Sequence, residues 1–265
     1  MDFQTKLKDL FTCEFPGPGV RQSRYNVYHA VLATLVLCGL VFAQGLSAFW
    51  RQFVYGLNQT MTPGTLLQNL ALSTVFFSVI IVTIWLIARF MPSPLRVVPQ
   101  EESSNPPNRS RAIVLALTIA PIVATVALGL NWLGATAIEF STNVKPADQE
   151  LVKCFLDGKY SLFLRGLLVL TVLFQAPLLE EPIFRGIIFR GLSKSMPIWP
   201  AMILSGAFFA LVHVNAASFI AVWFLGVVFA WLYHRTHTIL APMTLHFLFN
   251  GVNVVLLLFF PELAT

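Results

Sequence analysis

Residues 112–133 decide the fold class, and they read AIVLALTIAPIVATVALGLNWL. The run contains no charged residue, and about 20 apolar residues are enough for a helix to cross the hydrocarbon core of a bilayer. In lipid the backbone must satisfy its own hydrogen bonds, which only helices and closed barrels achieve. Barrel strands alternate apolar and polar residues. Because this run is continuously apolar, it predicts a transmembrane helix.

The composition of the whole chain agrees with this prediction. Of its 265 residues 57% are hydrophobic and only 11% are charged, and the mean hydropathy is +0.75. Soluble domains carry about 25% charged residues, so this chain lacks the polar residues that a water-exposed surface needs. We expect an all-α, polytopic integral membrane bundle of about seven to eight transmembrane helices, lying in the cell membrane and in contact with membrane lipids.

Further apolar runs lie on both sides of residues 112–133, and polar or proline-rich segments separate them. Residues 1–24 are too polar for a signal peptide, and their apolar residues recur at helical spacing, which predicts a short helix on the membrane surface. A second short helix is expected within the polar segment 135–160. The other predicted spans are about 27–49, 66–90, from Leu162 into the polar stretch 180–194, 198–213, 217–233 and 240–260.

The basic residues predict the orientation of these helices. Cytoplasmic loops of membrane proteins carry an excess of Lys and Arg, and a cytoplasmic N-terminus gives the larger basic count to the cytoplasmic side. The net charge of +5 is therefore read as an orientation signal, and no nucleic-acid partner is predicted. The outer side would carry Arg51, Lys145, Lys153, Lys159 and Arg165; the cytoplasmic side would carry Lys6, Lys8, Arg21, Arg24, Arg89, Arg96, Arg109, Arg111, Arg185, Arg190, Lys194 and Arg235.

The first polar cluster in this apolar background is EEPIFRG at residues 180–186. Each ionisable side chain within a span costs about 2.5–3.5 kcal/mol on insertion. On a helix Glu181 and Arg185 are four residues apart and can pair, which leaves Glu180 on a different face. A glutamate close to a second acid and partly removed from water can take a proton from water near neutral pH. The alternative is a helix end at the cytoplasmic interface, where these groups are simply solvated.

Two more polar patterns follow on later apolar runs. Phe209 and His213 are four residues apart, as are His246 and Asn250, so each pair shares one helix face. An imidazole and an amide that point into one cavity can donate to a developing oxyanion. The alternatives are a structural histidine at position 213 and ordinary hydrogen bonding between helices at 246 and 250.

Two features bear on how these patterns could meet. Pro177 and Pro182 each remove a backbone donor and tend to kink a helix, and the carbonyls that they free can shape a polar pocket. If a straight helix begins near Ile198, His213 lies about 22 Å along it, whereas His246 is near the start of its own span. The motifs can meet only if these helices are short, tilted or offset in depth, which is allowed where they line a wet cavity.

Taken in order, EExxxR, FxxxH and HxxxN on successive apolar helices resemble the CAAX protease and bacteriocin-processing family of intramembrane endopeptidases. The resemblance covers roughly residues 160–260 and extends to Phe184-Arg185-Gly186, the helix around Gly226 and the turn that leads into Ala241-Pro242. It implies a catalytic core at 161–265, with the active site inside its last four helices. Residues 1–24 would then be a cytoplasmic or interfacial segment, and 25–160 accessory helices and loops.

The resemblance also implies roles for the matched positions. Glu180 would activate the attacking water, assisted by His213, while His246 and Asn250 would form the oxyanion site. Supporting positions would be Glu181, Arg185 and Phe209. No cofactor is expected, because the chain lacks the HExxH motif of zinc proteases. Zinc stays an alternative, with Glu180, His213 and His246 as its three ligands and a fourth position left open.

Three functions are consistent with these observations. The favoured one is hydrolysis of a membrane-anchored or prenylated protein or peptide, with prenyl-protein processing and bacteriocin maturation or immunity both open. A proton-coupled transporter would also use buried acids and histidines. Transporters usually show internal repeats, whereas the polar residues here are confined to the second half of the chain. A non-catalytic membrane adaptor on the same scaffold is the third.

Overall fold

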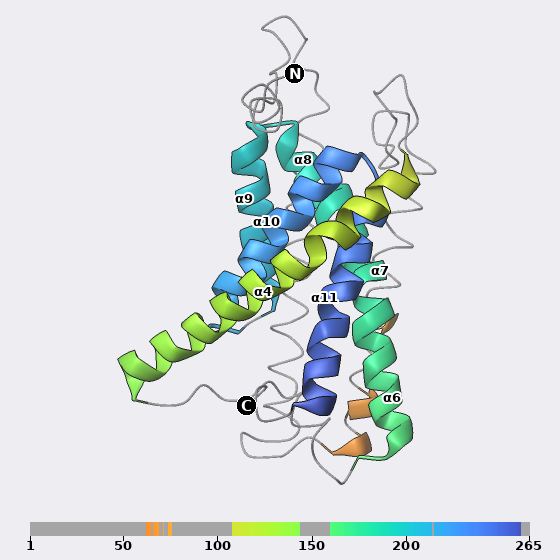
Figure 1. Ribbon diagram of the computed structural model, residues 1–265, viewed down its shortest axis with the longest axis vertical. Coiled ribbons are helices and arrows are strands. Elements are labelled where there is room, and N and C mark those ends of the chain that lie inside the picture. Colours follow the sequence, from red (N-terminus) through yellow and green to blue (C-terminus); the bar gives the residue numbers. More distant parts are fainter. Residues whose placement is uncertain are drawn as a thin grey trace, which may run out of the picture.

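A computed structural model describes residues 62–64, 66–68, 71, 74–75, 108–143, 160–213 and 215–260 of the chain (Figure 1). All secondary-structure elements in the described part of the chain are helices, which confirms the predicted all-α class. Within these residues four helices are long and apolar enough to cross a membrane. The predicted spans 27–49 and most of 66–90, the surface helix in 1–24 and the short helix in 135–160 lie outside the described residues.

The helix α4 (Arg109–Thr142) contains the run that decides the fold class. It is capped by Asn108, whose side chain accepts from the backbone N–H of Arg111, and it ends at Asn143 in a left-handed conformation. At 1.5 Å per residue its 34 residues span about 51 Å, more than the thickness of a bilayer core. It runs obliquely across α10 (Phe219–Thr236) and α11 (Leu240–Phe259), against which it packs (Figure 1).

A second continuous helical stretch runs from Leu162 to Ser193 and begins at the predicted residue. It consists of α6 (Leu162–Leu170), the π-helix η2 (Thr171–Gln175), α7 (Ala176–Glu181), the π-helix η3 (Pro182–Phe189) and α8 (Arg190–Ser193). The two prolines predicted to disturb this helix lie at the start of α7 and of η3. The π-helical pitch is rare, and it occurs often at functional sites.

The remaining helices complete a four-helix unit around this stretch. The short helix α9 (Ile198–Val212) leads through a turn into α10, and α10 leads into α11. Where α9 crosses α10 the two backbones touch, since a Cβ on Gly226 would lie 2.7 Å from the Cα of Gly206. Small residues at such crossings let membrane helices approach closely. The described helices agree with the predicted spans at 198–213, 217–233 and 240–260. The predicted span 112–133 lies within α4, which continues to Thr142, into the segment that the sequence predicts to be polar.

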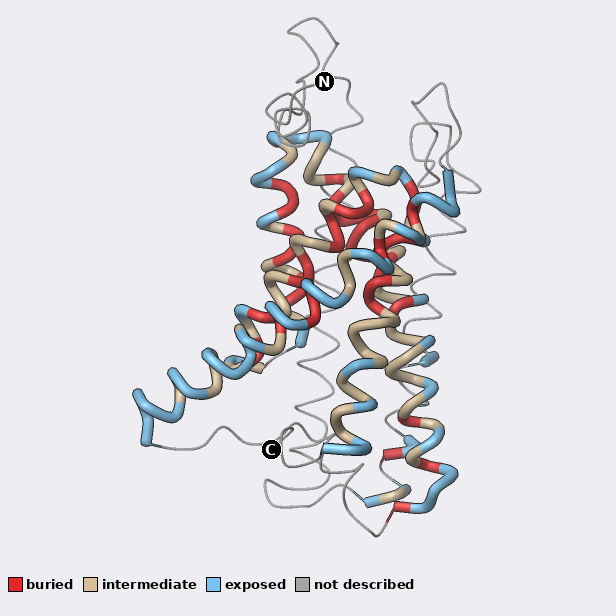
Figure 2. The backbone as a smooth tube through the Cα atoms, viewed as in Figure 1, coloured by how far each residue is buried: buried red, intermediate tan, exposed pale blue. Residues whose placement is uncertain are grey.

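Buried residues gather where these helices meet, at the end of the bundle that holds α8 and the start of α9 (Figure 2). The main apolar cluster draws on η3, α9, α10 and α11, and also on α4. The sequence analysis assigned the region of α4 to accessory helices, yet α4 contributes four alanine and valine residues to this core. They are Ala112, Ala116, Val123 and Ala127.

Candidate active site

A fully buried ion pair lies at the junction of these helices. Glu181 at the end of α7 and Arg185 in η3 are both 0% exposed. The Arg185 Nη1 donates to Oε1 of Glu181 at 3.2 Å. The Arg185 Nε lies 3.1 Å from Oε2 of Glu181, an ionic contact in which neither atom is aligned for a hydrogen bond. The pairing that the four-residue spacing predicts is therefore confirmed.

The Arg185 guanidinium has further partners that compensate its charge. Its Nη2 donates to the carbonyl of Gly226 on α10 at 3.2 Å. Its central carbon lies 4.5 Å from the ring centroid of Phe209 and 5.0 Å from that of Phe229. Cations are attracted to the faces of aromatic rings, most strongly where water is excluded. With the ring of Phe184 at 5.9 Å, one carboxylate, one carbonyl and three rings thus surround a charge that would be very costly alone in this position.

His246 reaches the same carboxylate from α11. Its Nδ1 lies 2.8 Å from Oε1 of Glu181, and its side chain is almost fully buried. A carboxylate only accepts hydrogen bonds, so Nδ1 carries the hydrogen, and Nε2 is an acceptor when the imidazole is neutral. The ring stacks on Phe229 at 5.0 Å and meets the edge of Phe209 at 5.9 Å. Glu181 therefore fixes the tautomer of His246, and the two rings fix its orientation.

Glu180 faces the other nitrogen of this imidazole. Its Oε2 lies 4.0 Å from Nε2 of His246, beyond the range of a direct hydrogen bond. The same oxygen is buried and has no hydrogen-bond partner in the part of the chain that the structure describes. The side chain as a whole is 19% exposed, unlike that of Glu181. The two neighbouring acids thus have different environments: Glu181 is neutralised by Arg185, and Glu180 has an oxygen available beside His246.

His213 joins this cluster through Phe209. It is exposed at the end of α9, where its Nδ1 donates to the carbonyl of Phe209 at 2.7 Å and its ring lies 4.7 Å from the Phe209 ring. Phe209 also contacts His246, so both imidazoles pack on the same aromatic ring. The offset between His213 and His246 that the sequence analysis raised is therefore small enough for both to reach Phe209. The described side-chain contacts of His213 are with Phe209 and not with Glu180.

Asn250 lies one turn after His246 but binds a different acceptor. Its Nδ2 donates to the carbonyl of Val172 at 2.8 Å. In η2 the N–H of Ala176 bonds to the carbonyl of Thr171, five residues earlier. The next donor in that pitch would be the nitrogen of Pro177, which carries no hydrogen. Asn250 thus satisfies a carbonyl that proline frees, and in this structure it does not share an acceptor with His246.

The residues proposed as zinc ligands do not come together in this arrangement. Among the described residues, no three His, Cys, Asp or Glu side chains lie close enough to hold one metal ion. Glu180 and His246 approach each other, whereas the described contacts of His213 are with Phe209. We therefore derive no reaction step through a metal.

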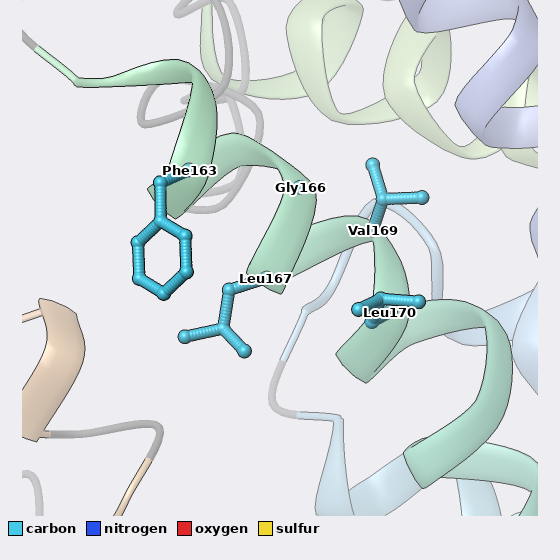
Figure 3. A pocket seen from close by; sticks show the side chains of 5 residues that line it. All are labelled: Phe163, Gly166, Leu167, Val169 and Leu170. Carbon is cyan, nitrogen blue, oxygen red and sulfur yellow. The ribbon is translucent and has the colours of Figure 1, made fainter.

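A pocket of about 460 Å³ lies away from these polar groups, on α6 (Figure 3). Its lining is apolar and consists of Phe163, Gly166, Leu167, Val169 and Leu170. Ten residues separate Leu170 from Glu180, which is about 15 Å along a helix. The hydrophilic cavity that hydrolysis would require at the motifs stays a prediction.

Three contacts at the site escaped the sequence analysis. These are the stacking of Phe229 on His246, the acceptance of a hydrogen bond from Arg185 by the Gly226 carbonyl, and the bond from Asn250 to Val172. Phe229 is one of 24 phenylalanines in the chain, so nothing in its local sequence distinguishes it. A signal did exist for Val172, because a proline five residues later removes its partner in a π-helix.

The comparisons with known proteins fit this geometry. A family model described as Type II CAAX prenyl endopeptidase Rce1-like matches residues 163–252. All three sequence patterns, and with them every polar side chain of the site, fall within that range. The predicted resemblance is confirmed.

One curated relative extends the likeness beyond this Rce1-like segment. YdiL, a candidate membrane peptidase of Bacillus subtilis (strain 168), is 28% identical over 163 residues. The match covers 61% of this chain and 64% of YdiL, so the chain spans slightly less than two-thirds of its relative. No solved structure matches the chain significantly. The likeness therefore supports a membrane peptidase and leaves the chemistry and the substrate to be argued from the site.

Proposed function

We propose that the chain is an intramembrane endopeptidase in which Glu180 activates water to hydrolyse a peptide bond. One observation carries this proposal. Within the Rce1-like segment, an acceptor oxygen of Glu180 faces the acceptor nitrogen of His246 at 4.0 Å, in a buried position. Two acceptors at this distance favour a donor between them, and water has two hydrogens to give.

The distance suits one water molecule. If a water oxygen lies about 2.8 Å from each acceptor, the angle acceptor–water oxygen–acceptor is about 90°, close to the H–O–H angle of water. One hydrogen would point to Oε2 of Glu180 and the other to Nε2 of His246. The lone pairs of the water oxygen then point away from both groups, where a peptide carbonyl can approach.

The reaction balances with these groups alone. Glu180 takes a proton from the water as the water oxygen forms a bond to the peptide carbonyl carbon, whose oxygen becomes an oxyanion. The carbon–nitrogen bond then breaks, and Glu180 returns the proton to the leaving amine. The products are a carboxylic acid, which keeps the second hydrogen of the water, and an amine; transfer of that proton to the amine or to solvent then gives the carboxylate. Glu181 would stabilise His246 if this imidazole becomes charged, as a carboxylate does in other histidine-containing sites.

His213 and Asn250 keep the roles that the resemblance implies, with one refinement. Asn250 donates one N–H of its amide to the carbonyl of Val172, and this bond holds the amide in place. The second N–H of the amide can then donate to an oxyanion. His246 donates from Nε2 only when it is protonated there. His213 would assist from its position against Phe209, with Nε2 as an acceptor when the ring is neutral.

A lipidated or membrane-anchored protein is the proposed substrate class. The family description names prenyl endopeptidases and the relative is a candidate membrane peptidase. The helices of the site have exposed apolar faces that suit a chain held in lipid, for example at Leu178 on α7 and Val252 on α11. Bacteriocin-type peptides are the alternative substrate, and both classes are proposed to be cut by the same residues.

The test is cleavage of a quenched prenylated peptide by the purified protein in nanodiscs. Replacing one catalytic acid–base group typically costs 10²–10⁴-fold, so Glu180→Gln should lower kcat by at least about 100-fold. The matched control is Glu139→Gln, because Glu139 is an exposed acid near the far end of α4. Its activity should equal that of the wild type. Cleavage by Glu180→Gln at the wild-type rate would rule out this mechanism.

A further inference from the structure

Within the described stretch Leu162–Ser193, the carbonyl of Val172 lacks both backbone partners that a helix usually offers. In the pitch of an α-helix its partner would be the N–H of Ala176, four residues later. That N–H donates instead to the carbonyl of Thr171, five residues earlier, in the π-helical pitch of η2. In this pitch the partner of Val172 would be Pro177, whose nitrogen carries no hydrogen. The π-helix and the proline together leave this carbonyl open.

The proline is unusual at this place because the helical backbone continues through it. Ala176, the residue before it, has a φ of −58° and a ψ of −57°, which are helical values that a following proline disfavours. Pro177 itself is buried, and the helical stretch runs on to Ser193. Since a proline inside a helix removes a backbone hydrogen bond, alanine would suit this backbone better. Such departures from local helix preference are typical of functional sites.

Asn250 on α11 uses the carbonyl that Pro177 leaves open. The helix α11 packs against η2 and α7 (Figure 1), and Nδ2 of Asn250 donates to the carbonyl of Val172 at 2.8 Å. A carbonyl oxygen only accepts hydrogen bonds, so the nitrogen of the amide, and not its oxygen, faces Val172. The last torsion of an asparagine side chain is broad and roughly two-fold. This one bond therefore decides which way the amide points.

The direction of this amide bears on the reaction, because Asn250 lies one turn after His246 on the same face of α11. The bond to Val172 uses one of the two hydrogens on Nδ2 and leaves the other for an oxyanion. An oxyanion is stabilised best by donors that are already aimed at it before the reaction begins. An amide that rotated freely would offer its second N–H in the right direction only part of the time.

We propose that Pro177 is a positioning residue of the hydrolytic site. By withholding a backbone donor from Val172, it reserves that carbonyl for Asn250 and so fixes the amide that donates to the oxyanion. Pro177 acts through Val172 and Asn250 rather than by contact with the peptide bond. The inference rests on the proposed function, and within it on the oxyanion role of Asn250.

The experiment measures kcat and KM of full-length variants in nanodiscs with the quenched prenylated peptide. Pro177→Ala returns an N–H that competes with Asn250 for the Val172 carbonyl. A hydrogen bond between neutral groups contributes a factor of about 2–10, so kcat should fall by about that factor. KM should stay unchanged, because the interaction with the oxyanion exists only in the transition state. The matched control is Pro121→Ala, the same change inside α4, which should cleave at the wild-type rate.

A backbone ester separates the missing donor from the shape of the proline ring. Pro177→lactic acid, introduced by nonsense suppression, has the side chain of alanine but an oxygen in place of the backbone N–H. It should recover most of the activity that Pro177→Ala loses. If Pro177→Ala does not fold, Pro177→Gly restores the same N–H and takes its place.

A double-mutant cycle then tests whether Pro177 acts through Asn250. Asn250→Ala should lower kcat by about 10²–10³-fold, as the removal of one oxyanion donor does. Adding Pro177→Ala to it should cause no further loss, because the amide that the proline positions is already absent. A proline that only shapes the helix would lower kcat by the same factor in both backgrounds.

Three results would overturn the inference. They are a wild-type kcat in Pro177→Ala or in Asn250→Ala, an equal loss in Pro177→lactic acid and Pro177→Ala, and a full further loss in the double variant. Each leaves the proposed function intact as long as Glu180→Gln lowers kcat by at least about 100-fold. Wild-type cleavage by Glu180→Gln removes the proposed function, and this inference with it.

Discussion

The long helical stretch from Leu162 to Ser193 has two halves with opposite surfaces. In its first half large apolar side chains are outside: Leu162 is 85% exposed and Phe163 75%. In its second half two charged side chains are inside: Glu181 and Arg185 are both 0% exposed. This difference in exposure arises because the bilayer, and not water, is the solvent of these helices. Lipid accepts apolar side chains freely, so helices associate through close packing and polar contacts rather than through a hydrophobic driving force.

The two halves should therefore contribute unequally to the free energy of unfolding. The second half holds the ion pair, and its η3 residues pack in the main apolar cluster with Phe209 of α9 and Phe229 of α10. The first half contributes apolar contacts to a much smaller cluster around Leu164 and Leu168. Substitutions in the second half should therefore affect unfolding strongly, and those in the first half weakly.

The largest difference should come from the two arginines of this stretch. Arg185→Met leaves the Glu181 carboxylate buried without its cation, and breaking a buried pair costs about 3–5 kcal/mol. Arg165→Met, in the part-exposed first half, should cost less than about 1 kcal/mol. Reversible unfolding in mixed micelles measures both free energies. Equal costs at the two positions would show that burial does not separate the halves.

Glycines give the next largest effect. A Cβ on Gly226 would lie 2.7 Å from Gly206, so Gly226→Ala must push α9 and α10 apart at a cost of about 1–3 kcal/mol. Gly186 lies in the same buried half, but a Cβ there would meet nothing within 4 Å. Gly186→Ala should be neutral or slightly stabilising, since alanine favours helix more than glycine does. A loss at Gly186 as large as at Gly226 would contradict the crossing geometry.

The described helices and the contact between Glu181 and Arg185 could be predicted from the sequence, because both depend on the spacing of residues close together in the chain. Apolar runs gave the starts at Leu162, Ile198 and Leu240, and the four-residue spacing gave the pair of Glu181 with Arg185. Contacts between helices far apart in sequence could not be predicted in this way. The Phe229 ring on His246 and the α4 residues in the core depend on how whole helices cross.

The link between Asn250 and Val172 sits where the two halves meet, and it provides a smaller effect. Asn250→Ala leaves the Val172 carbonyl without its partner, which should cost about 0.6–2 kcal/mol. Pro177→Ala restores a backbone donor near that carbonyl. We therefore expect the double variant to be more stable than the sum of the single effects predicts, by about 0.5–1 kcal/mol. Strict additivity in this double-mutant cycle would show that Pro177 does not free the carbonyl.

The smallest effect is expected at Phe163, which lines the apolar pocket on α6 (Figure 3). Its side chain is 75% exposed, so Phe163→Ala removes few contacts with the described residues and should change the free energy of unfolding by less than about 0.5 kcal/mol. The matched variant is Phe229→Ala, which removes a fully buried ring and should lower the free energy of unfolding by about 3–5 kcal/mol. A cost above about 2 kcal/mol at Phe163 would mean that another segment of the chain covers α6. Both halves of the stretch would then pack against protein, and the first half would no longer differ from the second by facing lipid.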